Sequence, residues 1–410
     1  MFLSYIWAIF IVGGLIFSLV NLFINKNYEI FNIITQNVFE MAKTGFEVSL
    51  GLTGILSLWL GLLKIAERGG LVDVLAKIIS PLFLRIFPEI PRNHPVNGTI
   101  AMNFAANMLG LDNAATPIGL KAMQQLQELN KDKEKASNSQ IMFVVLNASG
   151  LTIIPFTIIM YRFQLGALNP TDVFIPIFLT TSLATLAGLI SVSIIQKINI
   201  FNRIYVMFLS LFLGLLVCLY LLSRYLSPNK FQLYSTIAAN FIILFLIFLI
   251  VVRGLIKRVN VFESFIDGAK EGINVAIKII PFLVGILVAI GFFRSSGALE
   301  FITEFIKRVI SILGVDNSFV EALPTALMKP LSGSGARGMM IEAMKTFGPD
   351  SFVGKLSCIF QGTTDTTFYI ISVYFGSVGI KNTRYTLGCS LISDFVGIIS
   401  AIFIAYLFFM

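Results

Sequence analysis

The sequence predicts an all-α polytopic membrane protein with about nine full spans, built from two inverted-topology repeats with broken or re-entrant helices. Three observations lead to this fold class: the composition, a series of uncharged stretches of bilayer length, and an internal repeat. Hydrophobic residues make up 56% of the 410 residues and charged residues only 13%, whereas soluble globular proteins carry about 25% charged residues. We therefore expect contact with a lipid bilayer along most of the chain.

The candidate spans are long and apolar enough to cross a hydrocarbon core of about 30 Å. They are residues 2–25, 46–63, 141–161, 173–196, 204–223, 232–252, 272–293, 356–379 and 385–409. The first has no basic n-region and no small-residue cleavage motif, so we expect a retained span rather than a removed signal peptide. The third is interrupted by Asn147–Gly150 and Pro155, which indicates a broken helix.

Other segments between the spans are helical in pattern but too polar or too short to cross. Residues 64–87 and 298–313 combine charges with apolar residues at helical spacing, which predicts amphipathic helices at the interface. Residues 97–117 and 323–338 are rich in Gly, Asn, Ser and Pro, and Pro117 marks a new helix start. We expect the last two segments to be re-entrant or interfacial.

An internal repeat relates the two halves of the chain. The corresponding segments are Val38–Gly45 with Val261–Gly268, Arg68–Asp73 with Ser295–Glu300, Lys121–Met123 with Glu342–Met344, Leu146–Ser149 with Phe360–Thr363, and Asn169 with Asn382. The series keeps its order with small gaps. Basic loops mark the cytoplasmic side of membrane proteins, and this places Gly45 outside and Gly268 inside. The two repeats then have opposite topology, a pattern found in secondary transporters; a duplicated scaffold that does not transport is the alternative.

The basic segments also set the orientation of the termini. The segments assigned to the cytoplasm are residues 64–92, 131–135, 197–203, 253–270 and 381–384. The N-terminus is then cytoplasmic and the C-terminus outside. Arg294, Lys307 and Arg308 fall on the outer side and go against this assignment.

Asp365 is the only charge between residues 356 and 379. An ionisable group inside the membrane costs at least a few kcal/mol unless it faces water, a partner or a ligand, so we interpret Asp365 as a coupling residue. The alternatives are an Asp satisfied by neighbouring Thr hydroxyls, or a structural ion pair with Arg337 or Lys329. Asp394 is a second intramembrane acid and a second coupling candidate.

Two facing clusters of polar residues are the candidate substrate-binding groups. Helix N-termini near them could present N–H groups to an anionic group, and exposed carbonyls could hold Na⁺. The first cluster comprises Asn103, Asn107, Asp112, Asn113, Thr116, Asn147, Ser149 and Thr152. The second comprises Lys329, Ser332, Ser334, Arg337, Gln361, Thr363, Thr364, Asp365 and Thr366. For each Asn or Thr, the alternative is a hydrogen bond that only joins two helices.

Other functional classes find little support in the sequence. His94 is the only histidine, and there is no HExxH, P-loop or dinucleotide motif, so we expect no enzyme and no catalytic residues. Cys218, Cys358 and Cys389 lack CxxC spacing, so we expect neither a disulfide framework nor a metal site. The net charge of +8 fits basic loops rather than a nucleic-acid surface. No cofactor is expected beyond Na⁺ or H⁺ as a coupling ion.

Long motifs in both halves resemble known families. Residues 1–195 resemble the spore maturation protein A family through Leu60–Gly70, Phe87–Pro91, Gly110–Pro117 and Asn169–Asp172. The second half resembles the spore maturation protein B family through Ile290–Leu299, Pro330–Ala336, Gly348–Ser351, Gln361–Ile370 and Tyr374–Ile380. The resemblance implies a fusion of the two: residues 1–195 with a first repeat, a linking helix pair at 196–260, and residues 261–410 with a second repeat.

Both families belong to the nucleoside-recognition, or Gate, group, which is similar to nucleoside transporters and to the permease part of the ferrous-iron transporter. The resemblance implies a permease-like fold with two Gate repeats but no particular substrate. We therefore expect a secondary transporter of a small polar solute, nucleoside-like by family name, in a bacterial cytoplasmic (inner) membrane. A channel-like protein or scaffold of envelope or spore maturation and a divalent metal permease are the alternatives. The solute, direction, coupling ion and any homo-oligomer stay open.

Overall fold

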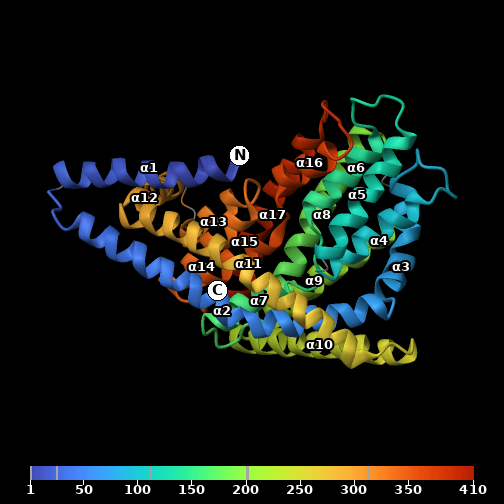
Figure 1. Ribbon diagram of the computed structural model, residues 1–410, viewed down its shortest axis with the longest axis horizontal. Coiled ribbons are helices and arrows are strands. Elements are labelled where there is room, and N and C mark those ends of the chain that lie inside the picture. Colours follow the sequence, from blue (N-terminus) through green and yellow to red (C-terminus); the bar gives the residue numbers. More distant parts are fainter. Residues whose placement is uncertain (1, 25, 111, 200–202, 313, 315) are drawn as a thin grey trace. The chain divides into compact units, whose positions relative to one another are not determined.

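The computed structural model describes residues 2–24, 26–110, 112–199, 203–312, 314 and 316–410 (Figure 1). In chain order its helices are α1 (Phe2–Phe23), α2 (Ile30–Arg68), α3 (Leu71–Ile86), α4 (Val96–Met108), α5 (Asp112–Leu129), α6 (Asn138–Ser149), α7 (Phe156–Gln164), α8 (Phe174–Ile195), α9 (Arg203–Tyr225), α10 (Pro228–Ile256), α11 (Val261–Ser295), α12 (Ala298–Ile312), the 3₁₀ helix η1 (Val320–Ala322), α13 (Leu323–Met328), α14 (Gly333–Phe347), α15 (Phe352–Thr363), α16 (Thr367–Gly376) and α17 (Thr386–Phe409). The predicted all-α class is confirmed.

Six described helices are long and apolar enough to cross a membrane. They are Tyr5–Phe23, Ile30–Arg68, Phe174–Ile195, Lys230–Ile256, Val261–Ser295 and Thr386–Phe409. Large apolar side chains on α10, such as Phe241, Leu244 and Phe248, are exposed as lipid-facing side chains are. The protein is therefore a multi-pass membrane protein in contact with lipid.

Two of the predicted spans are split rather than continuous. Residues 141–161 fall into α6 and α7, and residues 356–379 fall into α15 and α16. The first break contains Gly150, in left-handed backbone at φ 62°, and Pro155, which has no N–H to donate. A broken helix was predicted only for the first of these spans, so the sequence interpretation of 356–379 as one helix was wrong.

The polar stretch before Gly45 is helical from Ile30 onward. It forms one helix of 39 residues with the span that follows, and α11 is similarly continuous over 35 residues. Glycine allows α2 and α11 to pack closely: a Cβ on Gly45 would lie 2.9 Å from the backbone of Val284, and one on Gly272 would lie 2.7 Å from that of Ser57. Tertiary packing of this kind overrides the weak local tendency to break at a glycine.

The internal repeat is visible in the order of the helices. The series α2 to α8 recurs as α11 to α17: a long helix, an amphipathic helix, two helices of the predicted re-entrant segment, two short helices separated by a break, and a long apolar helix. In both series the amphipathic helix follows a glycine with positive φ, Gly70 at 69° and Gly297 at 82°. The corresponding elements therefore agree with the alignment of the two halves.

Contacts divide the chain into two compact units, each built from both halves. Unit 1 comprises residues 1–60, 157–170 and 269–361; unit 2 comprises residues 61–156, 171–268 and 362–410. Thus α7 of the first repeat belongs to unit 1 with α12 to α14, and α16 of the second repeat belongs to unit 2 with α3 to α6. The division predicted from the resemblance, with a linking helix pair at residues 196–260, concerns which part of the sequence is related to which family. It stays a prediction.

The core of unit 2 is organised around α6, in which residues 139–149 are all buried. An aromatic series runs through it: Phe83 of α3 contacts Phe104 of α4, with ring centroids 4.7 Å apart. Phe143 of α6 continues the series to Tyr374 of α16, at 5.4 Å. The two halves of the sequence are thus joined through one hydrophobic core in this unit.

Candidate functional site

The first helix break follows α6. A capping box of Ser137 and Gln140 begins this helix, and Gly150 ends it. The hydroxyls of Thr152 and Thr181 both donate to the carbonyl of Gly150, at 3.0 and 2.9 Å. The free end of α6 is therefore held by two hydroxyls, one from the break itself and one from α8.

The second helix break separates α15 from α16. Only Thr364, Asp365 and Thr366 lie between the two helices, and Thr366 is extended, with φ −82° and ψ 97°. Asp365 therefore lies between helices instead of inside one. Its side chain is exposed, and its Oδ1 accepts a 2.6 Å hydrogen bond from the backbone N–H of Thr366. A carboxylate beside the N-terminus of α16 is also favoured by the helix dipole.

The two breaks meet within unit 2. The backbone N–H of Asp365 donates to the carbonyl of Ala148 at 2.9 Å. A Cβ placed on Gly150 would lie only 2.7 Å from the backbone nitrogen of Asp365. Glycine at position 150 thus permits both the left-handed turn and the close approach of the second break. The main chain of one repeat thereby satisfies the interrupted main chain of the other.

Asp394 of α17 is buried beside the second break. Its Oδ2 accepts a 2.7 Å hydrogen bond from the hydroxyl of Thr367, the first residue of α16. On the same helix, the hydroxyl of Ser393 donates to the carbonyl of Ala184 on α8 at 2.6 Å. The second predicted coupling residue is therefore linked to the start of α16 by a direct hydrogen bond.

A polar cluster of amides adjoins the first break in unit 2. Asn107 donates to Oδ1 of Asn147 at 2.8 Å, and the hydroxyl of Tyr374 donates to the same oxygen at 3.3 Å. Asn103 donates to the carbonyl of Ala115 at 2.8 Å. Asn107 is half-buried, so its amide lies at the edge of the packed core. The cluster joins α4, α6 and α16.

The remaining members of the second predicted cluster belong to unit 1. The Ser332 hydroxyl caps α14 by accepting from the N–H of Gly335 at 3.0 Å, and the Gln361 amide donates to the carbonyl of Gly333 at 3.2 Å. The Arg337 guanidinium lies over the ring of Tyr161, 5.9 Å from its centroid. Gln361 is therefore attached to the N-terminal turn of α14.

The structure thus groups the predicted residues by unit. Unit 2 contains Asn103, Asn107, Thr116, Asn147, Ser149, Thr152, Thr363, Thr364, Asp365, Thr366 and Asp394. Unit 1 contains Lys329, Ser332, Ser334, Arg337 and Gln361. The side chains of Asp112 and Asn113 lie outside the described residues, although α5 begins at Asp112. An ion pair of Asp365 with Arg337 or Lys329 stays the alternative to its coupling role.

Sequence reasoning missed several residues that the structure places at the breaks. Thr181 donates to Gly150, Thr180 lies 3.4 Å from the Thr363 hydroxyl, and Tyr374 and Thr367 make the contacts given above. Three successive hydroxyl residues at 180–182, inside an otherwise apolar span, were a signal available in the sequence. Across the described residues, no group of three or more His, Cys, Asp or Glu is placed to hold a metal ion.

Comparison with known proteins gives two relatives, each matched over most of its own length. Spore maturation protein B of Bacillus subtilis (strain 168) is 48% identical over 160 residues, which cover 39% of this chain and 88% of that protein. Spore maturation protein A of the same organism is 39% identical over 185 residues, which cover 45% of this chain and 91% of that protein. These matches confirm the resemblance to a fused pair. No solved structure matches the chain significantly.

The family model described as "Nucleoside recognition" (Gate) matches twice, at residues 49–164 and 276–381. The two matches contain the helix breaks after α6 and after α15, and they follow the two repeats seen in the order of helices. Together they cover more than half of the chain. The chain therefore belongs to the nucleoside-recognition, or Gate, family.

Proposed function

We propose that the protein is a secondary transporter of a small polar solute, nucleoside-like as the first candidate, with ion or proton coupling at Asp365. The paired helix breaks carry this proposal. Broken main chain at membrane depth is tolerated mainly where it is buried in protein or lines a cavity, and transporters with inverted repeats bind substrate and coupling ions at such breaks. Membership of the family supports the same class of function.

The chemistry of the breaks supports coupling to a small cation. Asp365 is exposed at the second break, while the Gly150 carbonyl and several Thr hydroxyls gather at the first and second breaks. Carboxylate, carbonyl and hydroxyl oxygens are the ligands that hard cations prefer, and a carboxylate can also carry a proton. Na⁺ and H⁺ are therefore the coupling ions to test. Asp394 is the second group for this role, through its bond to Thr367.

The membrane and the orientation belong to the proposal as well. We place the protein in a bacterial cytoplasmic (inner) membrane, with the N-terminus in the cytoplasm and the C-terminus outside, because of the distribution of basic residues. The two repeats then have inverted topology, and alternating access arises from movement of one repeat against the other.

A ligand screen by thermal stability tests the proposal. The purified protein is screened with nucleosides, amino acids, small organic acids and divalent metals, each with and without Na⁺ and at two pH values. A solute at about a hundred times its dissociation constant stabilises the folded state by about 2.7 kcal/mol. Asp365→Asn is expected to abolish the stabilisation, whereas Glu128→Gln, on the exposed surface of α5, is expected to retain it.

A scaffold role is the second candidate, because both relatives are named for spore maturation. A scaffold predicts that no solute at saturating concentration shifts the melting temperature of well-folded protein. It also predicts that Asp365→Asn changes stability alone. A solute whose effect depends on Asp365 would exclude it.

A further inference from the structure

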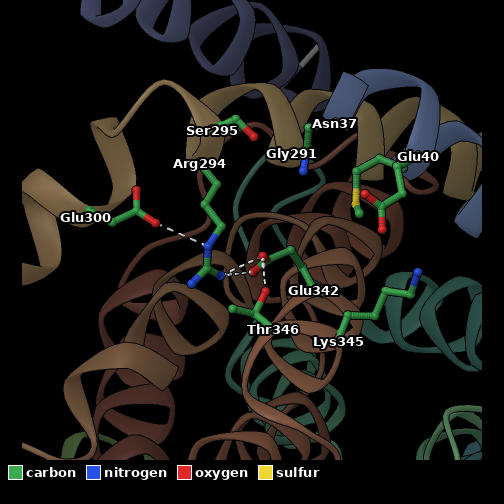
Figure 2. Close-up of a pocket in the computed structure, with 10 residues that line it drawn as sticks. Asn37, Glu40, Gly291, Arg294, Ser295, Glu300, Glu342, Lys345 and Thr346 are labelled. Carbon is green, nitrogen blue, oxygen red and sulfur yellow. Dashed lines mark hydrogen bonds and ion pairs between the residues drawn. The ribbon is translucent and has the colours of Figure 1, made fainter. Parts of the chain in front are cut away.

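A cavity of about 400 Å³ lies in unit 1, and none of its lining residues is a residue of the predicted site. It is lined by Asn37, Glu40 and Met41 of α2, Gly291, Arg294 and Ser295 of α11, Glu300 of α12, and Glu342, Lys345 and Thr346 of α14. Figure 2 shows Arg294 reaching down between Glu300 and Glu342, with Glu40 and Lys345 on the opposite side. Its volume is in the range of small-molecule sites, which is about 300–1,000 Å³.

Some of the charges in this cavity are already paired. Nη1 of Arg294 lies 2.5 and 2.6 Å from the two carboxylate oxygens of Glu342, and its Nε lies 3.2 Å from Glu300. Thr346 donates a further hydrogen bond to Glu342 at 2.8 Å. Glu342 is 7% exposed, so this pair forms the floor of the cavity. One guanidinium thus serves two carboxylates, which leaves the group with an excess negative charge.

Other polar groups in the cavity can accept further hydrogen bonds or pair with a further charge. The Glu40 side chain makes no hydrogen bond or ion pair with the described part of the chain, and the buried Oδ1 of Asn37 has no hydrogen-bond partner there. Lys345 donates to the hydroxyl of Thr44, a neutral partner. Among the lining residues, three carboxylates therefore face two cations. Burial raises the pKa of Glu300, with Arg294 opposing the rise and Glu342 adding to it.

We propose that this cavity binds a small organic cation, whose ammonium group is received by Glu40, on the side opposite the Arg294–Glu300 contact. An ammonium supplies the charge that the lining lacks and donates to the carboxylate oxygens that have spare lone pairs. The size of the cavity fits an organic molecule rather than one metal ion. None of its lining residues is among the predicted substrate-binding or coupling residues, and none lies at the helix breaks.

Binding of n-butylammonium to the full-length protein in detergent tests the proposal, with butan-1-ol and butyrate as the uncharged and anionic ligands of matched size. Dissociation constants are measured by titration calorimetry near pH 7. Glu40→Gln is expected to weaken n-butylammonium binding about tenfold or more, because the carboxylate charge that strengthens the hydrogen bond to the ammonium is lost. Lys345→Gln is expected to strengthen it, because a repelling charge is removed.

Two variants serve as controls. Glu47→Gln makes the same change on the same helix at a residue that pairs with Lys43 and does not line the cavity, so it is expected to bind as the wild type does. Asp365→Asn is expected to bind n-butylammonium normally, which separates this site from the transport proposal. The proposal would be overturned if the wild type bound no n-butylammonium, or bound butyrate more tightly. It would also be overturned if Lys345→Gln weakened n-butylammonium binding, or if Glu40→Gln, with an unchanged melting temperature, bound it as the wild type does.

Discussion

Asp365 and Ala148 are joined through their main chains: the N–H of Asp365 donates to the carbonyl of Ala148 at 2.9 Å. The two residues belong to different repeats, and each lies where an apolar helix is interrupted. An unpaired backbone group at membrane depth costs several kcal/mol, so each break helps to make the other tolerable. The function proposed for this protein depends on that pairing.

The contact between Thr367 and Asp394 is expected to stabilise the second break. Thr367→Val keeps the shape of the side chain but removes a hydrogen bond to a buried carboxylate. We expect the free energy of unfolding to fall by about 1.5–3 kcal/mol. Thr367→Ser, which retains a hydroxyl, is the control and should lose much less. Equal losses in the two variants, measured by thermal or denaturant unfolding, would show that the hydroxyl is not what matters.

Gly150→Ala is expected to destabilise the meeting of the two breaks. The added Cβ would be strained at φ 62° and would lie 2.7 Å from the nitrogen of Asp365. Gly166→Ala measures the strain alone, because Gly166 has φ 81° and nothing lies within 4 Å of its added Cβ. Left-handed backbone costs an alanine about 1–2 kcal/mol, so Gly150→Ala should lose more than this and Gly166→Ala about this amount. Similar melting temperatures for the two variants would argue against a close contact at Gly150.

Arg162 is expected to be one of the most sensitive residues in unit 1. Its side chain is 0% exposed, and it donates to the carbonyls of Pro349, Pro170 and Asn169 and to the carboxylate of Asp350. Removing one partner of a buried ion pair costs about 3–5 kcal/mol. We therefore expect Arg162→Ala to reduce the yield of folded protein and its melting temperature strongly.

Lys381 provides the matched comparison in unit 2. Lys381 lies in the loop between α16 and α17, and its Nζ is 2.7 Å from the carboxylate of Glu134. Both side chains are well exposed, at 75% and 69%. Exposed ion pairs contribute about 0–1 kcal/mol, so Lys381→Ala should melt close to the wild type. Equal losses of melting temperature in Arg162→Ala and Lys381→Ala would contradict the stabilising role assigned to the buried Arg162 side chain.

Glu300 gives a pH dependence of stability with a definite sign. Burial raises its pKa above the ordinary value of 4.5. A raised folded-state pKa gives stability that is complete below the unfolded pKa and is lost as pH rises through the folded pKa. Relative to Glu300→Gln, the wild type should therefore lose stability as pH rises from about 4.5. Parallel melting curves for wild type and variant from pH 4 to pH 7 would contradict this.

Local sequence patterns were sufficient for the all-α class and the repeat, but not for the position of Asp365. Residues 356–379 are apolar and long, which favours a continuous helix. The break there is stabilised by Ala148 and Gly150, which are far away in sequence, and no local pattern reports such a partner. The first break was predictable because Gly150 and Pro155 interrupt a helix by themselves.

The polar first half of α2 is a second feature whose structural role local sequence patterns do not predict. Asn37 and Glu40 lie in a polar stretch between two candidate spans, and the sequence pointed to no site residue there. In the structure they are helical and line a charged cavity with Arg294 and Glu342. Likewise, the exchange of α7 and α16 between the two compact units depends on tertiary contacts alone. Neither feature leaves a periodic signal in the sequence.

Solute uptake into liposomes containing the purified protein tests the central proposal most directly. The solute selected by the stability screen is supplied outside the vesicles, with an imposed Na⁺ or proton gradient. The account predicts gradient-driven accumulation by the wild type and by Glu128→Gln, and none above empty vesicles by folded Asp365→Asn. Accumulation by Asp365→Asn equal to that of the wild type would contradict coupling at the paired breaks, and no accumulation by a wild type that binds the solute would contradict transport itself.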